Sequence, residues 1–247
     1  MSIQRALQKL DEKKITLDSY RPLSPDLINN LNEWYKIELT YTSNALEGNT
    51  LTSSETALVV EKGITVGGKT LQEHLEAINH AFAFDYILEL AQSNRQDITV
   101  HTILMIHQLI LKKIDDKNAG KFRTINVRIK GSDVVFPHAI KVPELMDEFI
   151  HWLHTVDKHP VLIACEAHFK FVSIHPFADG NGRTARLLMN LLLLQTGYPV
   201  AVIRPELRKE YIDALEHGQK TGDLEPFYII IMQAVDKSFD TYLKQVA

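Results

Sequence analysis

The chain has 247 residues, of which 45% are hydrophobic and 23% are charged. This is the composition of an ordinary globular protein, and it excludes a largely disordered chain. The formal net charge is −4 and no dense run of lysine or arginine occurs, which argues against a nucleic-acid-binding surface and leaves any strong anion binding to a local site.

Cysteine use and hydropathy bear on the compartment. Cys165 is the single cysteine and has no partner for an internal disulfide, and no charged-then-apolar leader opens the sequence. The longest apolar run, Leu187–Leu194, is interrupted by Asn190 and is far shorter than the roughly 20 residues that a bilayer span needs. We therefore expect a cytoplasmic protein without membrane association.

The N-terminal third of the chain carries strong helix-start signals. Ser24 is a candidate N-cap with proline behind it, and apolar residues at helical spacing predict a helix over about residues 25–48. The sequences TSSE, beginning at Thr52, and TLQE, beginning at Thr70, have capping-box spacing and predict two more helix starts. The second of these helices should cover residues 71 to about 93.

One pair of strands is predicted in an otherwise helical chain. The sequence TINVRIKGSDVVF places apolar residues on both sides of a polar turn that contains Gly131, which favours a β-hairpin over about residues 122–136. Prolines, glycines and apolar spacing predict helices over about residues 100–113, 143–156, 160–173 and 182–196, with two more after Pro205 and Asp223. The predicted fold is mostly α, a helical bundle with one β-hairpin.

The stretch IHPFADGNGRTARLLMN concentrates groups that suit phosphate chemistry. His175 precedes a proline, which disfavours helical geometry and should place the imidazole just past a helix end, in a position suited to a base. The segment Gly180-Asn181-Gly182 can turn its amides inward, and a helix that begins there adds its positive end. An anion site beside a base is the consequence.

Charged side chains complete this pattern. Arg183 and Arg186 are three residues apart, so they share a helix face near the same N-terminus, and their planar guanidinium groups suit phosphate oxygens. Asp179 offers a hard oxygen ligand for Mg²⁺ held jointly with phosphates. The alternative, surface ion pairs and a histidine bound to a carbonyl, must account for all of these positions at once.

The same residues carry a family resemblance. HPFADGNGRTAR fits the Fic signature His-Pro-Phe-x-[Asp/Glu]-Gly-Asn-Gly-Arg-x-x-Arg at every fixed position, and RLLMNLLLLQTGYP, KFRTINVRI and TSNALEGNTLT also resemble Fic proteins that have an N-terminal inhibitory helix. The similarity extends from about Thr40 to the end of the chain. It implies a Fic-fold catalytic core over residues 96–247, with the hairpin as its flap, and an N-terminal helical region over residues 1–95.

The resemblance implies transfer of AMP from ATP to a Ser, Thr or Tyr hydroxyl of a target protein. His175 would take the proton of that hydroxyl, Asp179 would hold Mg²⁺, and Arg186 would bind the γ-phosphate. The residues that would contact the nucleotide are Asp179, Gly180, Asn181, Gly182, Arg183, Thr184, Ala185, Arg186, Lys130, Gly131, Ser132, Tyr211 and Gln219. An animal relative carries a second tyrosine where Ile212 stands and an asparagine where Gln219 stands, so the resemblance is looser at the base end.

A second motif implies a built-in brake. SNALEG fits the family's inhibitory pattern [Ser/Thr]-x-x-x-Glu-[Gly/Asn], and its Ser43 and Glu47, four residues apart, face the same side of a helix. By resemblance Glu47 would pair with Arg186 and block the productive pose of the γ-phosphate. In some relatives the same glutamate positions a water that removes AMP from a modified target, so a brake and a hydrolase role both remain open.

Several alternatives follow from the same residues. They are an enzyme that mainly removes AMP, a transferase that uses UTP or GTP, a nucleotide sensor without turnover, and a transcription regulator, the last of which the absence of basic clustering disfavours. The flap would receive the target as an added strand, and self-modification and a homodimer are further expectations. His151 and His154, three apart on a predicted helix, could bind zinc with His159, but no cysteine or acidic pattern with metal-ligand spacing accompanies them, so we expect a partly exposed helix face instead of a zinc site.

Overall fold

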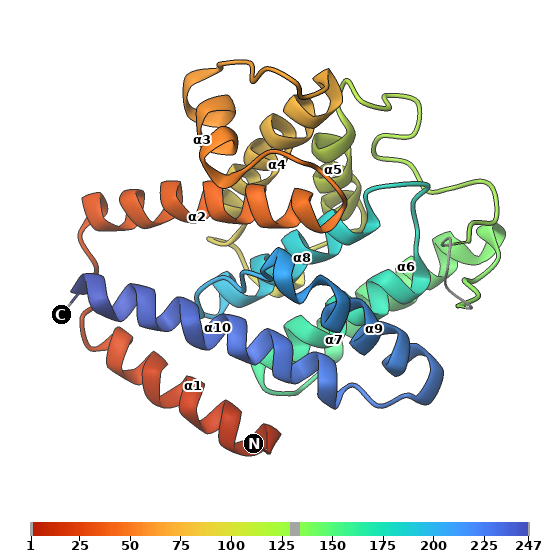
Figure 1. Ribbon diagram of the computed structural model, residues 1–247. Helices are drawn as coiled ribbons and strands as arrows, with labels where there is room; N and C mark the ends of the chain where they lie inside the picture. The colour runs from red at the N-terminus through yellow and green to blue at the C-terminus, as the bar shows by residue number, and fades with distance from the viewer. Residues whose placement is uncertain (1, 129–133, 247) are drawn as a thin grey trace.

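The computed structural model describes residues 2–128 and 134–246, and helices make up most of this part (Figure 1). The α-helices are α1 (Ile3–Asp18), α2 (Pro25–Leu46), α3 (Ser53–Lys62), α4 (Leu71–Leu90), α5 (Val100–Leu111), α6 (Val142–Thr155), α7 (Pro160–Ile174), α8 (Asn181–Gln195), α9 (Arg208–Thr221) and α10 (Glu225–Val246). Short 3₁₀ helices are η1 (Arg95–Asp97), η2 (Ala139–Lys141) and η3 (Pro205–Leu207).

Helix α8 forms the centre of the bundle. Apolar residues surround its axis, and nearly every residue from Asn181 to Leu193 is buried, which is the pattern of a helix enclosed by others. It packs against α7, α4, α5 and α2. The first turn of α8 carries the glycine-arginine motif, so the motif lies at the centre of the bundle.

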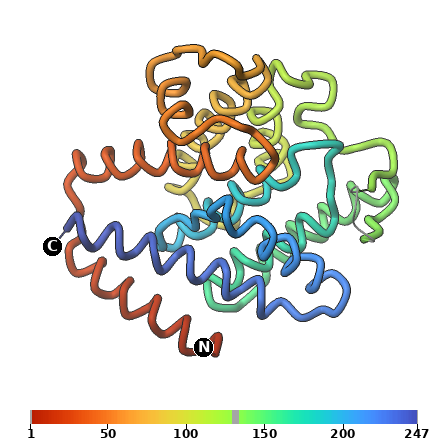
Figure 2. Tube along the Cα trace, in the orientation of Figure 1, coloured from red at the N-terminus to blue at the C-terminus, as the bar shows by residue number. Residues whose placement is uncertain are grey.

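Helix α1 was not among the predicted elements. It lies alongside α10, and the two termini of the chain are close to this pair of helices (Figures 1 and 2). Ser2 caps it, and Lys13 bridges to Asp236 at 2.6 Å and to Asp240 at 2.5 Å. The helix is therefore stabilised by a partner more than 200 positions away, which local spacing does not reveal.

The cap predictions are confirmed. Ser24 accepts a hydrogen bond from the Leu27 amide at the start of α2, and both Thr52 and Thr70 form reciprocal capping boxes with the glutamate three residues later. Helix α5 ends two residues before the predicted end. Lys113, at that end, has a left-handed backbone with φ of 60°.

The predicted β-hairpin is not shown. The described residues contain no β-strand, and residues 129–133, with the whole predicted turn, lie outside the described part. The two flanking segments are instead linked by side chains, since Asn126 accepts from the Ala139 amide at 2.9 Å and Arg123 binds carbonyls on both sides. Side-chain bonds of this kind tie two segments together without a strand ladder.

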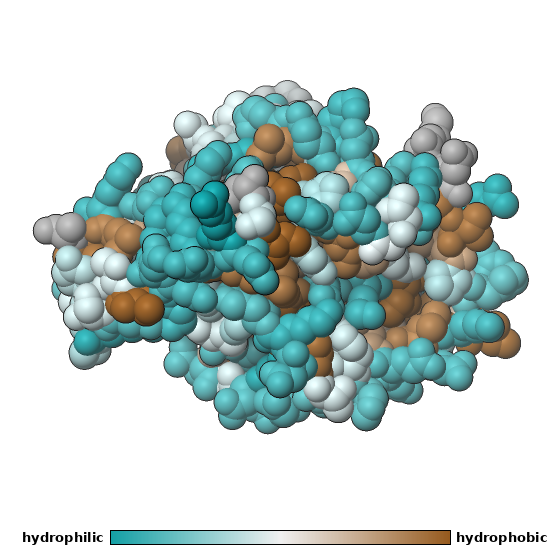
Figure 3. Space-filling view, turned by 90° about the horizontal axis from the view of Figure 1, so that it is seen from below, coloured by the Kyte–Doolittle hydropathy of each residue, from teal (hydrophilic) through white to brown (hydrophobic). Residues whose placement is uncertain are grey.

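The surface offers no sign of a membrane-spanning element. Among the described helices, none combines the length and apolarity needed to cross a bilayer. On the face seen from below, hydrophilic side chains cover most of the surface and hydrophobic ones show between them (Figure 3). Apolar surface of this kind is normal for a folded protein.

Two buried histidines lead us to expect acid-sensitive stability. Burial lowers the pKa of His80 and of His168 to about 3, whereas an unfolded histidine titrates near 6.5. Below pH 6.5 the unfolded chain binds protons that the folded chain does not, so the free energy of unfolding should fall by about 1.4 kcal/mol per pH unit for each histidine. Above pH 6.5 neither group contributes.

Urea unfolding at pH 7.5, 6.0 and 5.0 measures this effect. His80→Gln should reduce the slope of stability against pH, while His101→Gln, which changes an exposed histidine of α5, should not. Equal slopes in wild type and His80→Gln would contradict the assignment to His80.

Candidate active site

His175 lies at the junction between α7 and the loop that leads to α8. It caps α7 with φ of 51° and ψ of 59°, in the left-handed region, and its N–H still donates to the Phe171 carbonyl. Such a backbone costs a non-glycine residue about 1–3 kcal/mol and persists only where surrounding contacts enforce it. The predicted helix break before Pro176 is confirmed, and the break turns His175 towards a cavity.

The imidazole of His175 is neutral at physiological pH. Burial is the largest cause and lowers the pKa of His175 to about 4, although a main-chain hydrogen bond at Val172 opposes it. The ring of Phe136 lies against the imidazole, with centroids 4.2 Å apart. A neutral imidazole is the form that can accept a proton.

The loop from α7 to α8 is held by a histidine that the sequence analysis did not select. His107 of α5 accepts at Nδ1 from the Gly120 amide (3.0 Å), so Nε2 carries the proton and donates to the Asp179 carbonyl (3.0 Å). Its ring stacks on Phe177 with centroids 3.6 Å apart. Asn181 closes the loop from the other side, because its amide group both accepts from and donates to the Phe177 main chain at 3.0 Å.

A cavity of about 300 Å³ opens beside His175 and the first turn of α8. Val172, Ile212 and Leu215 contribute an apolar end, and polar groups converge at the other end, which is the usual character of a ligand site. The predicted site residues that line it are Glu47, His175, Asn181, Gly182, Arg186, Tyr211 and Gln219.

Arg186 is bound to the end of α2 through three hydrogen bonds. Nε donates to Ser43 Oγ at 2.9 Å, and Nη2 donates to the Ser43 carbonyl at 2.9 Å and to Glu47 Oε1 at 2.7 Å. Burial alone would raise the pKa of Glu47, but the Arg186 cation outweighs it and holds that pKa below its usual value. The side chain of Glu47 is 40% exposed, so the ion pair opens onto the cavity.

The Glu47 carboxylate lies against the start of α8. A Cβ on Gly182 would be 2.2 Å from Glu47 Oε1 and 2.9 Å from Arg186 Nη1, so only glycine leaves room for this approach. Free N–H groups and the helix dipole favour an anion at this place. The sequence analysis assigned the place to phosphate, and here a carboxylate of the same chain lies in it.

Arg183 does not line the cavity and has other carboxylate partners than Arg186. It is 3% exposed, and its guanidinium lies 3.3 Å from Asp179 Oδ2 and 3.5 Å from Glu76 Oε1. Glu76 also accepts from the Asn49 amide at 2.9 Å, so it connects Arg183 with the residues just after α2. The sequence spacing placed the two arginines on one face but did not reveal their separate carboxylate partners.

Three predicted or neighbouring residues shape the rest of the cavity. The Tyr211 hydroxyl shares a hydrogen bond of 2.8 Å with His168 Nε2, and burial raises the pKa of Tyr211, so the hydroxyl stays protonated. Gln219 donates to Ser173 Oγ at 3.3 Å. Arg208, which was not predicted, donates from Nε to the Leu46 carbonyl at 2.8 Å and caps α2 at the cavity wall.

Some predicted contact residues lie elsewhere. Thr184 and Ala185 are fully buried in α8 and do not line the cavity, so their side chains serve packing. Lys130, Gly131 and Ser132 lie outside the described residues.

The residues near the loop fit a magnesium ion that is shared with phosphates. No group of three or more potential metal-binding side chains occurs in the described part of the chain, which does not offer a cage made by protein alone. The carboxylate of Asp179 is 66% exposed beside the anion-binding loop. Mg²⁺ in nucleotide sites is commonly held by one or two carboxylates together with phosphate oxygens, and Asp179 supplies such a carboxylate.

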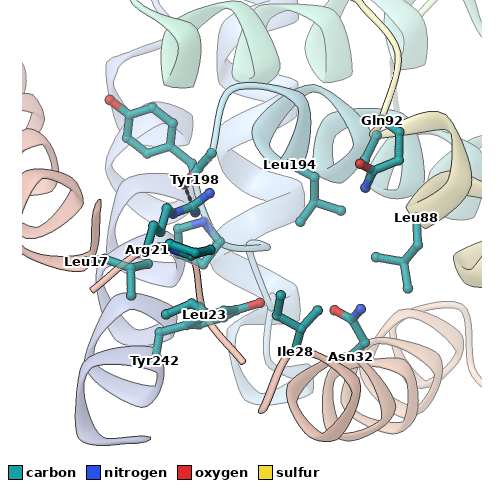
Figure 4. A pocket seen from close by; sticks show the side chains of 14 residues that line it. Leu17, Arg21, Leu23, Ile28, Asn32, Leu88, Gln92, Leu194, Tyr198 and Tyr242 are labelled. Atoms are coloured by element: carbon teal, nitrogen blue, oxygen red, sulfur yellow. Dashed lines mark hydrogen bonds between the residues drawn. The ribbon is translucent and has the colours of Figure 1, made fainter. Parts of the chain in front are cut away.

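A larger cavity, of about 580 Å³, lies away from this site (Figure 4). It is lined by Leu17 of α1, by Arg21 and Leu23 of the α1–α2 connection, by Ile28 of α2 and by Tyr242 of α10. None of the residues of the glycine-arginine motif reaches it. The predicted base and the predicted anion-binding residues meet in the smaller cavity instead.

Comparisons with known proteins indicate the family of the chain. A profile of the Fic/DOC family matches residues 97–193. The "Protein adenylyltransferase Fic" of Culex quinquefasciatus is 36% identical over 243 residues, which is 97% of this chain and 48% of that protein. This chain spans about half the length of the curated relatives it matches.

Solved structures show the same similarity. A variant of Fic-1 from C. elegans is 30% identical with a TM-score of 0.84, and the match covers 98% of this chain and 72% of that chain. A Fic domain-containing signaling protein from Bacteroides thetaiotaomicron is 28% identical with a TM-score of 0.86, and the match covers 98% of this chain and 97% of that chain.

Proposed function

The chain belongs to the Fic/DOC family, and from this premise we propose that it transfers AMP from ATP to a hydroxyl group of a target protein. One observation carries the proposal: neutral His175, Arg186 and the first turn of α8 meet in one cavity. The similar proteins named protein adenylyltransferase support the same class of enzyme, a nucleotidyltransferase.

The geometry suggests a division of roles in the reaction. His175 takes the proton from a Ser, Thr or Tyr hydroxyl as its oxygen attacks the α-phosphorus of ATP. The new O–P bond forms as the bond to the β-phosphate breaks, and pyrophosphate leaves. Positioning and charge stabilisation, rather than covalent help, are what such a transfer requires.

The phosphates would lie against the start of α8. Amides of residues 180–182 and the guanidinium of Arg186 would bind the oxygens, and Arg183 would act through Asp179, which its guanidinium approaches to 3.3 Å. Asp179 would hold Mg²⁺ with the phosphates, and the ion would neutralise charge on the leaving group. Tyr211 would support the guanidinium of Arg186, and Gln219 would lie at the nucleoside end of the cavity.

We assign Glu47 as an inhibitory residue. Its carboxylate binds the Arg186 guanidinium and occupies the place at the helix N-terminus that a γ-phosphate would need. ATP can then bind fully only after Glu47 leaves, so basal transfer is low. Ser43 shares the brake because it accepts a second N–H of the same guanidinium.

The remaining assignments concern organisation. Residues 1–95 would be a regulatory region folded on a catalytic core of residues 96–247, and the segment 122–136 would act as a flap that receives an extended target segment. A homodimer, self-modification and a cytoplasmic location complete the proposal. The target protein itself is not specified by any of these residues.

Mass spectrometry of the intact protein tests the proposal. Glu47→Gly protein incubated with Mg²⁺ and ATP should gain AMP, and EDTA should abolish the gain because Asp179 would meet the phosphates only through the Mg²⁺ ion that both bind. GTP, CTP and UTP serve as matched controls. A stronger adduct from another nucleotide would overturn the choice of ATP, and tight binding without any adduct would favour a nucleotide sensor.

A further inference from the structure

Arg123 is a buried cation that does not line the cavity. It is 4% exposed and lies near the start of the segment 122–136 assigned to the flap, before residues 129–133. Nε donates to the His175 carbonyl at 2.8 Å, Nη1 donates to the Ile125 carbonyl at 3.0 Å, and Nη2 donates to the Pro137 carbonyl at 2.5 Å. Its own amide donates to the Pro176 carbonyl at 2.9 Å.

These four bonds connect three parts of the chain. Ile125 lies before residues 129–133, Pro137 lies after them, and His175 and Pro176 belong to the catalytic loop. A guanidinium is planar and holds its donors in a fixed fork, so one group sets the distance between both flanks of the flap and the main chain of the base. Lysine could not replace this geometry, because its ammonium is a point charge on a flexible stem.

Contacts around the Arg123 guanidinium also bring the flap segment against His175. The ring of Phe136, one residue before Pro137, lies on the imidazole of His175 with centroids 4.2 Å apart and an angle of 31° between planes. The left-handed backbone of His175 needs an external restraint, and the bond from Arg123 to its carbonyl is one.

We propose that Arg123 is a positioning residue that locks both flanks of the flap to the main chain of His175, so that a bound target segment and the base keep a fixed register. The proposal deepens the transferase function and rests on it for the catalytic part. Because Arg123 does not line the cavity, its loss should disturb delivery of the hydroxyl more than binding of the nucleotide. A misplacement of about 1 Å can cost about a hundredfold in rate.

Hydrogen exchange measured by mass spectrometry tests the link without using activity. Arg123→Ala should raise exchange together in residues 122–128, 134–138 and 175–177, while α7 keeps its protection. Arg95→Ala is the matched control, since Arg95 also donates to a main-chain carbonyl, that of Val156 at 3.0 Å, but far from the site. Increased exchange confined to residues near position 123 would overturn the proposal.

Kinetics in the Glu47→Gly background test the catalytic part. Arg123→Ala should lower the rate of self-modification about a hundredfold and leave the Kd for Mg-ATP within about twofold, and added guanidinium ion should restore part of the rate. Arg123→Lys should also be slow, and it replaces the alanine variant if that one does not fold. An unchanged rate, or an equal loss of binding and rate without rescue, would show that Arg123 is only structural.

Failure of the transferase function gives a different result. In that case the Glu47→Gly parent itself shows no adduct, and the exchange experiment still decides whether Arg123 couples the flap to His175.

Discussion

Glu47→Gly is expected to raise the rate of AMP transfer by about tenfold. The variant removes a carboxylate that lies 2.7 Å from Arg186 Nη2 and against the first turn of α8. A charge-assisted hydrogen bond contributes about 1.5–3 kcal/mol when buried, and the 40% exposure of Glu47 places this one at the lower end. Each 1.4 kcal/mol of interaction that ATP no longer has to compete with raises its affinity by a factor of about ten.

The fold should tolerate this change. Glu47 is the C-cap of α2, just after its last helical turn, and glycine is well suited to a helix end. Ser43 and Arg208 still hold α2 at its C-terminus, since neither of their hydrogen bonds uses the Glu47 side chain. The gain in rate should therefore come with a gain in ATP affinity rather than with loss of structure.

Wild type and two variants make the measurement decisive. The initial rate of AMP incorporation and the Kd for Mg-ATP are compared in wild type, Glu47→Gly and Glu38→Gln. Glu38 is the matched control because it is a carboxylate of the same helix that pairs with Arg204 at 2.6 Å, away from the cavity. If Glu47→Gly bound and incorporated no more than wild type, the brake would be disproved.

The same variants separate a brake from a hydrolase. A target that carries AMP is incubated with wild type and with Glu47→Gly. Release of AMP by wild type alone would assign Glu47 a second role, the positioning of an attacking water from its exposed side. Release by neither protein would leave Glu47 as a brake only.

Local chemistry made much of the fold predictable. Thr52 and Thr70 each meet a glutamate three positions later, and such a pair specifies a helix start with no help from distant residues. Helix α1 escaped prediction because its lysines find their aspartates on α10. The flap hairpin remains a prediction. Alternating apolar residues predicted two strands, but that pattern could not reveal that the side chains of Arg123 and Asn126 bind the main chain of the flanking segment.

The site was predictable in its members but less so in their contacts. The motif named His175, Arg186 and Gly182, and all three line one cavity. The sequence could not reveal that the side-chain amide of Asn181 bonds to the Phe177 main chain. These bonds depend on the conformation of a loop that His107 holds from another helix. It also could not place Arg183 against Glu76, which is more than a hundred positions away.

His175→Ala in the Glu47→Gly background is expected to lower AMP transfer by about a hundred- to ten-thousandfold, the usual contribution of a general base. Mg-ATP should still bind, because Arg186 and the loop amides remain. The matched control is His101→Ala, which removes an exposed histidine of α5. Equal rates before and after the loss of His175 would remove it from the mechanism.

The pH dependence of the transfer rate identifies the base independently. An exposed histidine would lose activity below about pH 6.5, whereas burial lowers the pKa of His175 to about 4, so its neutral form persists further into acid. The rate in Glu47→Gly should therefore change little between pH 7.5 and 5.5, and fall as pH approaches the lowered pKa. Only pH values at which urea unfolding shows a folded protein are used, because His80 and His168 weaken the fold in the same direction. A rate that halves near pH 6.5 while the protein is folded would mean that the base is solvated, and the closed arrangement of Phe136 over His175 would not be the reacting one.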